Sequence, residues 1–219
     1  MALQTASCLP KRRIVFLRKP VSKEASEMRL FVALEIPEAV RENLAAIRKN
    51  FSSIGPGLRW VPSENLHVTL KFIGSLPNDK LEAIIDALRH VRADKSLNLK
   101  FSGTGGSAAG VYWASIEPDP ALEELAADID HCLAPIGIAG ENRAFHPHVT
   151  IARFKDRKIL KKLDHLLDEN GVSGHQRNKY DFGSVTPTEF HLIESKTLPT
   201  GPIYSELRSF PLASALPGN

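Results

Sequence analysis

Runs in which apolar and polar positions alternate are separated along the chain by segments of helical period. The apolar spacing of Val40, Leu44, Ile47 and Phe51 predicts a helix. In all, helices are predicted over 38–51, 79–91, 118–133 and 156–170. Strands are predicted over 29–36, 66–73, 97–102, 111–116, 148–154, 181–186, 188–195 and 203–210. Loops rich in glycine, proline or serine are predicted over 52–64 and 103–110.

The second half of this pattern repeats the first. Each half contains one strand that begins with His-x-Thr, at His67 and at His148, and is followed by a helix. The predicted fold is therefore α+β, with two pseudo-symmetric lobes of largely antiparallel sheet, helices on the outer faces and an active-site cleft between the lobes. We predict one such domain over 28–212, preceded by a disordered basic extension over 1–27 and followed by a tail over 213–219.

Charge is distributed unevenly along the chain. The formal net charge is +3. Residues 1–27 hold six basic and two acidic side chains, whereas the remainder holds 22 basic and 23 acidic ones. The predicted domain therefore has no general basic excess, and any contact with RNA must be local.

Composition indicates a globular protein without a membrane span. The two cysteines, Cys8 and Cys132, suggest neither a disulfide framework nor a thiolate metal site, so we expect the reducing cytoplasm. No apolar run approaches the ~20 residues that a spanning helix needs. We expect a monomer.

The two His-x-Thr strands carry the candidate chemistry. In a strand, alternate side chains share a face, so His67 lies beside Thr69, and His148 beside Thr150. The same alternation predicts that Val68, Leu70 and Phe72 point into a core. If the two strands face one another, the site holds two imidazoles and two hydroxyls.

This set of side chains suits the opening of a cyclic phosphodiester. One base must deprotonate the attacking water and one acid must protonate the leaving alkoxide, and histidine does either near neutral pH. Threonine hydroxyls can donate to the non-bridging oxygens, where negative charge accumulates. We expect no metal and no cofactor, and the sequence has no convincing carboxylate cluster for a metal. The alternative is that each histidine merely caps a strand, but chance gives only about 0.3 copies of His-x-Thr in a chain of this composition.

The chain resembles the two-histidine (2H) phosphoesterase superfamily, and within it the RNA 2′,3′-cyclic phosphodiesterase group, also called 2′-5′ RNA ligase. The resemblance runs from about Met28 to Leu212 as an ordered set of segments. These are Arg29-Leu-Phe-Val-Ala-Leu, Trp60-Val-Pro, Glu64-Asn-Leu-His-Val-Thr-Leu-Lys-Phe-Ile-Gly74, Phe145-His-Pro-His-Val-Thr-Ile-Ala-Arg153, Glu194-Ser195 and Gly201-Pro-Ile-Tyr204.

The resemblance implies hydrolysis of RNA or nucleotide 2′,3′-cyclic phosphate ends to 2′-phosphates and, in the reverse sense, joining of RNA ends through 2′-5′ linkages. It implies that His67 is the proton donor and His148 the proton acceptor, roles that the near-symmetric sequence alone does not assign. Thr69 and Thr150 would hold the phosphate. The loop 103–110 has no aromatic residue where the family often has one, so no base-stacking residue is predicted there.

Two further residues are candidates for phosphate contact. Arg153 lies five residues after His148, and strict alternation puts it on the opposite face, unless a bulge turns it back. His146 stands where the family commonly has a basic residue. Two other hypotheses stay open: a non-catalytic nucleotide-binding module on the same fold, and a phosphodiesterase for another substrate such as 2′-5′ oligoadenylate.

Overall fold

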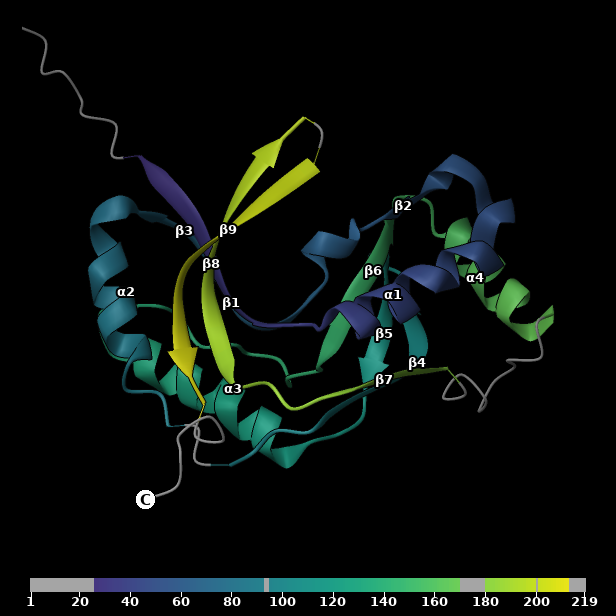
Figure 1. Ribbon diagram of the computed structural model, residues 1–219. Coiled ribbons are helices and arrows are strands. Elements are labelled where there is room, and N and C mark those ends of the chain that lie inside the picture. The colour runs from purple at the N-terminus through teal and green to yellow at the C-terminus, as the bar shows by residue number, and fades with distance from the viewer. Residues whose placement is uncertain (1–25, 93–94, 170–179, 200, 213–219) are drawn as a thin grey trace, which may run out of the picture.

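A computed structural model describes residues 26–92, 95–169, 180–199 and 201–212 (Figure 1). Within these ranges the α-helices are α1 (Glu38–Ala46), α2 (Leu81–Leu88), α3 (Pro120–Leu133) and α4 (Lys158–Glu169), with 3₁₀ segments η1 (Ile47–Gly57), η2 (Ser63–Asn65), η3 (Asn78–Lys80) and η4 (Ala134–Ile136). The strands are β1 (Glu27–Glu35), β2 (Leu58–Trp60), β3 (His67–Pro77), β4 (Leu99–Ser107), β5 (Val111–Ile116), β6 (His148–Phe154), β7 (Asp181–Val185), β8 (Glu189–Leu198) and β9 (Gly201–Pro211).

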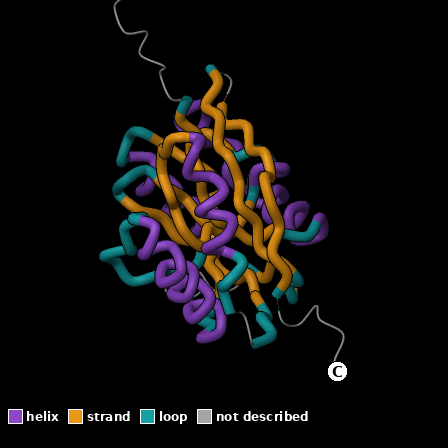
Figure 2. The backbone as a smooth tube through the Cα atoms, turned by 90° about the vertical axis from the view of Figure 1, so that its left-hand side faces the viewer, coloured by secondary structure: helices purple, strands orange, loops and turns teal. Residues whose placement is uncertain are grey.

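The strands form one antiparallel sheet that divides into two halves. The strand order is β7-β4-β5-β6-β3-β1-β8-β9, and β2 pairs with β6. The units β1-α1-β3-α2 and β5-α3-β6-α4 follow the same order on either side of the central β6–β3 join. Figure 2 shows the strands side by side, with helices packed around them. The predicted α+β fold with two similar halves of largely antiparallel sheet is confirmed.

In each unit, one helix packs against the half of the sheet that the other unit forms. Helix α1 packs against β7, and its continuation η1 packs against α4, whereas α3 packs against β3 and α2. In Figure 1, α2 and α3 accordingly lie with the left-hand half and α1 and α4 with the right-hand half. Asp119 begins α3, because its Oδ1 accepts a hydrogen bond from the backbone N–H of Ala121 at 2.8 Å. These exchanged helices bury both halves of the sheet in one continuous core.

Three elements differ from the predictions. The helix predicted over 38–51 changes at Ala46 from α to 3₁₀ geometry, and η1 then includes Gly55 with φ at +75°. The predicted loop 52–64 contains the short strand β2. The predicted glycine-rich loop 103–110 is mostly strand, because β4 continues to Ser107 in register with β5.

The predicted extension 1–27 lies outside the described residues up to position 25, and Glu27 is the first residue of β1. The predicted tail 213–219 also lies outside them. Among the helices of the described residues, none has the length and the apolar character that a membrane span requires.

Candidate active site

The two histidine strands meet at the centre of the sheet. Val68 of β3 pairs with Val149 of β6 in antiparallel register, and both side chains are fully buried. Residues directly opposite one another in an antiparallel pair share a face. Extending this register by one residue on each side places His67 opposite Thr150, and Thr69 opposite His148, on the other face of the sheet. The pairing therefore brings the four motif residues to one site.

Both imidazoles are held in the same way by backbone carbonyls. Nδ1 of His67 lies 2.7 Å from the carbonyl oxygen of Asn65, and Nδ1 of His148 lies 2.8 Å from that of His146. A carbonyl oxygen only accepts, so Nδ1 carries the proton in each ring and donates it. The nitrogen that gains and loses a proton is therefore Nε2 in both histidines.

Aromatic rings pack against each histidine. The His67 ring centroid lies 4.9 Å from that of Phe31 and 5.3 Å from that of Tyr204, which meets it edge-on. The His148 ring centroid lies 5.6 Å from that of Trp113. These contacts restrict how each imidazole can rotate, so both Nε2 atoms stay oriented.

The surroundings of His67 shift its pKa. Burial lowers the pKa of His67 below its ordinary value, although the hydrogen bond to the Asn65 carbonyl opposes this. The positive charges of Arg153 and of His148 lower the pKa of His67 further. A second proton on the pair is therefore disfavoured while the first is present.

A β-bulge changes which residues of β3 face the site. Thr69 and Lys71 pair with consecutive residues of β1, so Leu70 is an extra residue in the strand. Lys71 is consequently buried, with 2% of its surface exposed, and Phe72 is 58% exposed, on the same face as His67. The prediction that Phe72 points into the core is wrong, because it assumed uninterrupted alternation.

The second strand has a bulge at the equivalent position. Thr150 and Ala152 pair with consecutive residues of β5, which makes Ile151 the extra residue. Ile151 and Ala152 are both buried, and Arg153 is exposed on the same face as His148. Strict alternation therefore does not hold here, and the bulge turns Arg153 back to the face of His148, as the sequence analysis allowed. The charge of Arg153 acts on His67 across the join between the two halves of the sheet.

The remaining predicted residues lie as follows. Thr69 and Thr150 are partly exposed beside the two histidines. His146 has an exposed side chain, and the contact by which it reaches the site is its carbonyl oxygen, which holds His148. The structure thus brings the four motif residues and Arg153 to one face, and leaves the His146 imidazole at the surface.

Sequence reasoning did not single out Tyr204 as a site residue. Its ring lies against His67 and Phe31. The β8–β9 hairpin that carries it is also bonded to η2, the segment just before the His67 strand, because Asn65 Nδ2 donates to the Pro202 carbonyl at 3.1 Å. Burial raises the pKa of Tyr204, so its hydroxyl stays protonated at neutral pH. No local pattern reveals this contact, because it depends on pairing between distant strands.

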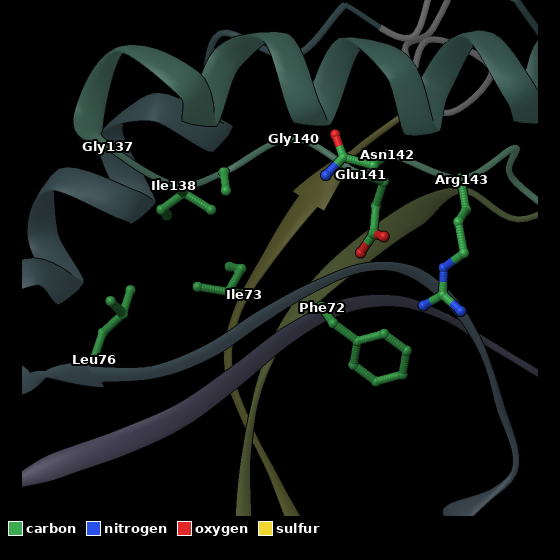
Figure 3. Close-up of a pocket in the computed structure, with 10 residues that line it drawn as sticks. Phe72, Ile73, Leu76, Gly137, Ile138, Gly140, Glu141, Asn142 and Arg143 are labelled. Atoms are coloured by element: carbon green, nitrogen blue, oxygen red, sulfur yellow. The ribbon is translucent and has the colours of Figure 1, made fainter.

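A cavity of about 420 Å³ opens beside Phe72. It lies between β3 and the segment 137–143, and Figure 3 shows the side chains of Glu141 and Arg143 extending from that segment toward β3. The cavity therefore adjoins the site face at Phe72 and carries both signs of charge.

A buried ion pair fixes the segment that lines this cavity. Lys71 Nζ lies 2.6 Å from Oδ1 of Asp130 on α3 and donates to the Ala139 carbonyl at 2.6 Å. Oδ2 of Asp130 in turn accepts from the backbone N–H of Glu141 at 2.8 Å. The bulge that exposes Phe72 thus also turns Lys71 inward to hold the segment before His148.

The chain is similar to known proteins over most of its length. The model of a family described as LigT-like phosphoesterase matches residues 34–111 and 115–204. An RNA 2′,3′-cyclic phosphodiesterase of Methanocaldococcus jannaschii is 31% identical over 84% of this chain and 100% of its own length. One of Archaeoglobus fulgidus is 31% identical over 84% of this chain and 99% of its own.

A solved structure shares the same fold. The crystal structure of E. coli LigT complexed with 3′-AMP superposes with a TM-score of 0.68 and 25% identity, covering 85% of this chain and 99% of that one. The similarity therefore extends through both halves of the sheet.

Proposed function

Because the chain belongs to the LigT-like phosphoesterase family of two-histidine phosphoesterases, we propose that it hydrolyses RNA 2′,3′-cyclic phosphate ends to 2′-phosphates. The observation that supports this most directly is the pair of imidazoles on β3 and β6, each with Nδ1 bonded to a carbonyl and Nε2 left to exchange a proton. Its substrates would be RNA ends, or nucleotides, that carry a cyclic phosphate.

The proposed reaction is an in-line displacement at phosphorus. A water oxygen forms a bond to phosphorus as the bond from phosphorus to the ribose 3′ oxygen breaks. One Nε2 takes the proton of the attacking water, and the other gives a proton to the 3′ oxygen. The product is a 2′-phosphate with a free 3′ hydroxyl, and proton exchange with solvent restores the starting state of the pair. No step needs a metal.

We assign the donor role to His67 and the acceptor role to His148, as the family resemblance implies. The lowered pKa of His67 is consistent with this assignment, because a weaker hold on the proton makes the imidazolium a stronger acid. The negative charge of a bound phosphate would offset the low pKa and help to keep His67 protonated in the complex.

Phosphate recognition is assigned to the neighbouring polar groups. The hydroxyls of Thr69 and Thr150 would donate to the non-bridging oxygens, and the Arg153 guanidinium would neutralise their charge. His146 would add charge only when protonated. The exposed ring of Phe72 offers a flat apolar surface on the same face, of the kind on which nucleobases stack.

The same groups suit a second nucleophile. A 5′ hydroxyl in place of water would give a 2′-5′ linkage, with the same proton acceptor and the same leaving oxygen. The rival proposals are a non-catalytic nucleotide-binding module and a phosphodiesterase for another substrate such as 2′-5′ oligoadenylate. The presence of two imidazoles with exchangeable Nε2 atoms favours catalysis over binding alone.

The test is an assay of purified protein on three substrates, with and without chelator. The substrates are a nucleoside 2′,3′-cyclic phosphate, RNA with the same end, and 2′-5′ oligoadenylate. We expect hydrolysis at an unchanged rate in chelator, with the phosphate of the product on the 2′ oxygen. Hydrolysis of 2′-5′ oligoadenylate alone would favour the rival substrate, and binding without turnover would favour the nucleotide-binding module.

The pH profile of kcat/KM should be bell-shaped, with its acid limb below the ordinary histidine pKa of ~6.5. The active form holds one proton on the pair, and the acid limb reports addition of the second. Burial of His67 and the charge of Arg153 both resist that proton, because they lower the pKa of His67. The limbs belong to the pair and not to single residues.

The Arg153→Gln variant tests whether the charge of Arg153 lowers the pKa of His67. Loss of its positive charge should raise the pKa of His67 and move the acid limb to higher pH. Arg29→Gln is the matched control, because Arg29 acts on the Tyr204 hydroxyl and is not among the charges that shift His67. An acid limb that stays in place in Arg153→Gln, or moves equally in both variants, would contradict this electrostatic assignment.

A further inference from the structure

Basic side chains concentrate in one short part of a domain that as a whole holds nearly equal numbers of basic and acidic residues. Between positions 153 and 163 the chain has six lysines and arginines and a single acidic residue, Asp156. The acidic side chains of α4 come later in its sequence, at 164, 168 and 169. We define the basic rim as the exposed residues Arg59, Lys155, Arg157, Lys158, Lys161 and Lys162.

The basic rim begins at the candidate active site. Arg59 of β2 pairs directly with Arg153 of β6, and both side chains are exposed. Directly opposed residues share a face, so Arg59 lies beside Arg153 on the site face. Two like charges opposite one another destabilise a sheet, and this arrangement therefore favours an anion that lies between or across them.

Helix α4 continues the positive surface. At 100° per residue, Lys158, Lys161 and Lys162 fall within one stripe, while Ile159 and Leu163 are buried on another side. The helix lies next to β2, because the Ile159 side chain packs against Gly57, the residue just before that strand. Figure 1 shows α4 beside β2 and the end of β6.

The charges of the basic rim are unpaired within the described structure. None of its six side chains forms an ion pair with a described residue. Lysines elsewhere on the surface do have such partners, as Lys95 has in Glu124 and Lys100 in Glu117. A polyanion binds to clustered cations that have no acidic partner. Here the cluster adjoins the proposed site for the terminal phosphate.

We propose that the basic rim binds the phosphate backbone of an RNA strand whose cyclic-phosphate end occupies the active site. This inference rests on the proposed function and extends it, because it makes the preferred substrate an RNA strand and not a mononucleotide. RNA is favoured over an anionic membrane because the rim adjoins Arg153, where a terminal phosphate would lie. The strand leaves the site past Arg59 and follows the exposed stripe of α4.

The test compares substrates in a variant with Lys158→Gln, Lys161→Gln and Lys162→Gln together. For an RNA of roughly ten nucleotides with a cyclic-phosphate end, kcat/KM at low salt should fall on the order of tenfold. If each lysine contacts one phosphate, the log–log salt dependence of binding should flatten by about 2, since each contact with a single strand contributes ~0.7. Turnover of a nucleoside 2′,3′-cyclic phosphate should not change, because these lysines lie outside the catalytic groups.

The control removes three positive charges elsewhere, with Lys80→Gln, Lys95→Gln and Lys100→Gln together, and should leave RNA turnover and its salt dependence as in the wild type. Equal losses in both triple variants, or wild-type protein with no preference for RNA over the mononucleotide, would overturn the proposal. So would rim-dependent binding to phosphatidylserine vesicles with RNA binding unchanged. Anisotropy with a 2′-phosphate-ended RNA decides the binding question even if no substrate is turned over, in which case only the proposed function fails.

Discussion

Replacing His148 by alanine should lower the single-turnover rate of cyclic phosphate hydrolysis by ~10²–10⁴, and replacing His67 should have a similar effect. Each change removes one of the two groups that exchange a proton through Nε2. The double variant should be little slower than the worse single variant, because both histidines serve one proton-transfer event. The measurement is rapid-mixing hydrolysis of a nucleoside 2′,3′-cyclic phosphate by folded protein.

These variants should fold, since both imidazoles are partly exposed and their removal opens no enclosed cavity in the core. His90 provides the matched control. It is exposed on the surface, and its Nδ1 likewise lies 2.8 Å from a backbone carbonyl, that of Asp86, so His90→Ala should keep the wild-type rate. If His148→Ala hydrolysed at near wild-type rates while still binding a 2′-phosphate nucleotide, the nucleotide-binding module would be the better account.

Replacing Lys71 by methionine should destabilise the fold by about 3 kcal/mol, measured as the free energy of unfolding in urea. The variant keeps most of the side-chain volume but leaves Asp130 without its cation and the Ala139 carbonyl without its donor. Loss of one partner from a buried pair costs ~3–5 kcal/mol. We expect the lower end, because the Asp130 side chain is 25% exposed and its Oδ2 keeps the hydrogen bond from the backbone N–H of Glu141.

An exposed ion pair is the control for Lys71. Lys95 and Glu124 are 61% and 58% exposed, so Lys95→Met should change the free energy of unfolding by no more than ~0.5 kcal/mol. Adding Asp130→Leu to Lys71→Met should recover part of the loss, because the uncompensated charge is then gone. A loss below ~1 kcal/mol in Lys71→Met would mean that the pair does not hold the segment 137–143 in place.

The four residues that the sequence placed together in pairs are those of the two His-x-Thr motifs. His67 with Thr69, and His148 with Thr150, follow from strand alternation, which needs no knowledge of the rest of the chain. The two-part fold was also predictable, because hydrophobic period and the repeated His-x-Thr strand are local features. The family resemblance added the roles of donor and acceptor, which local pattern could not distinguish.

Tertiary structure decided what lies beyond the fourth position of each motif. At Leu70 and at Ile151, two consecutive residues of the neighbouring strand, β1 or β5, pair with residues on either side of the bulged one. Leu70 and Ile151 therefore have no partner in that pairing. A single extra residue reverses the side chains that follow it, up to the next irregularity of the strand. This is why Phe72 and Arg153 face the site although alternation predicted otherwise.

Long-range contacts decided the rest. Lys71 and Ala139 are 68 positions apart, and Tyr204 reaches His67 only because β9 folds back beside β8, which in turn pairs with β1. The near-zero charge of the domain likewise concealed the basic rim, since a sum over the chain does not record which charges share a surface. The sequence by itself determined the fold class and the four motif residues, because their signals repeat every two or three to four residues. The surroundings of those residues depended on strand register and on packing between distant segments, which no local period encodes.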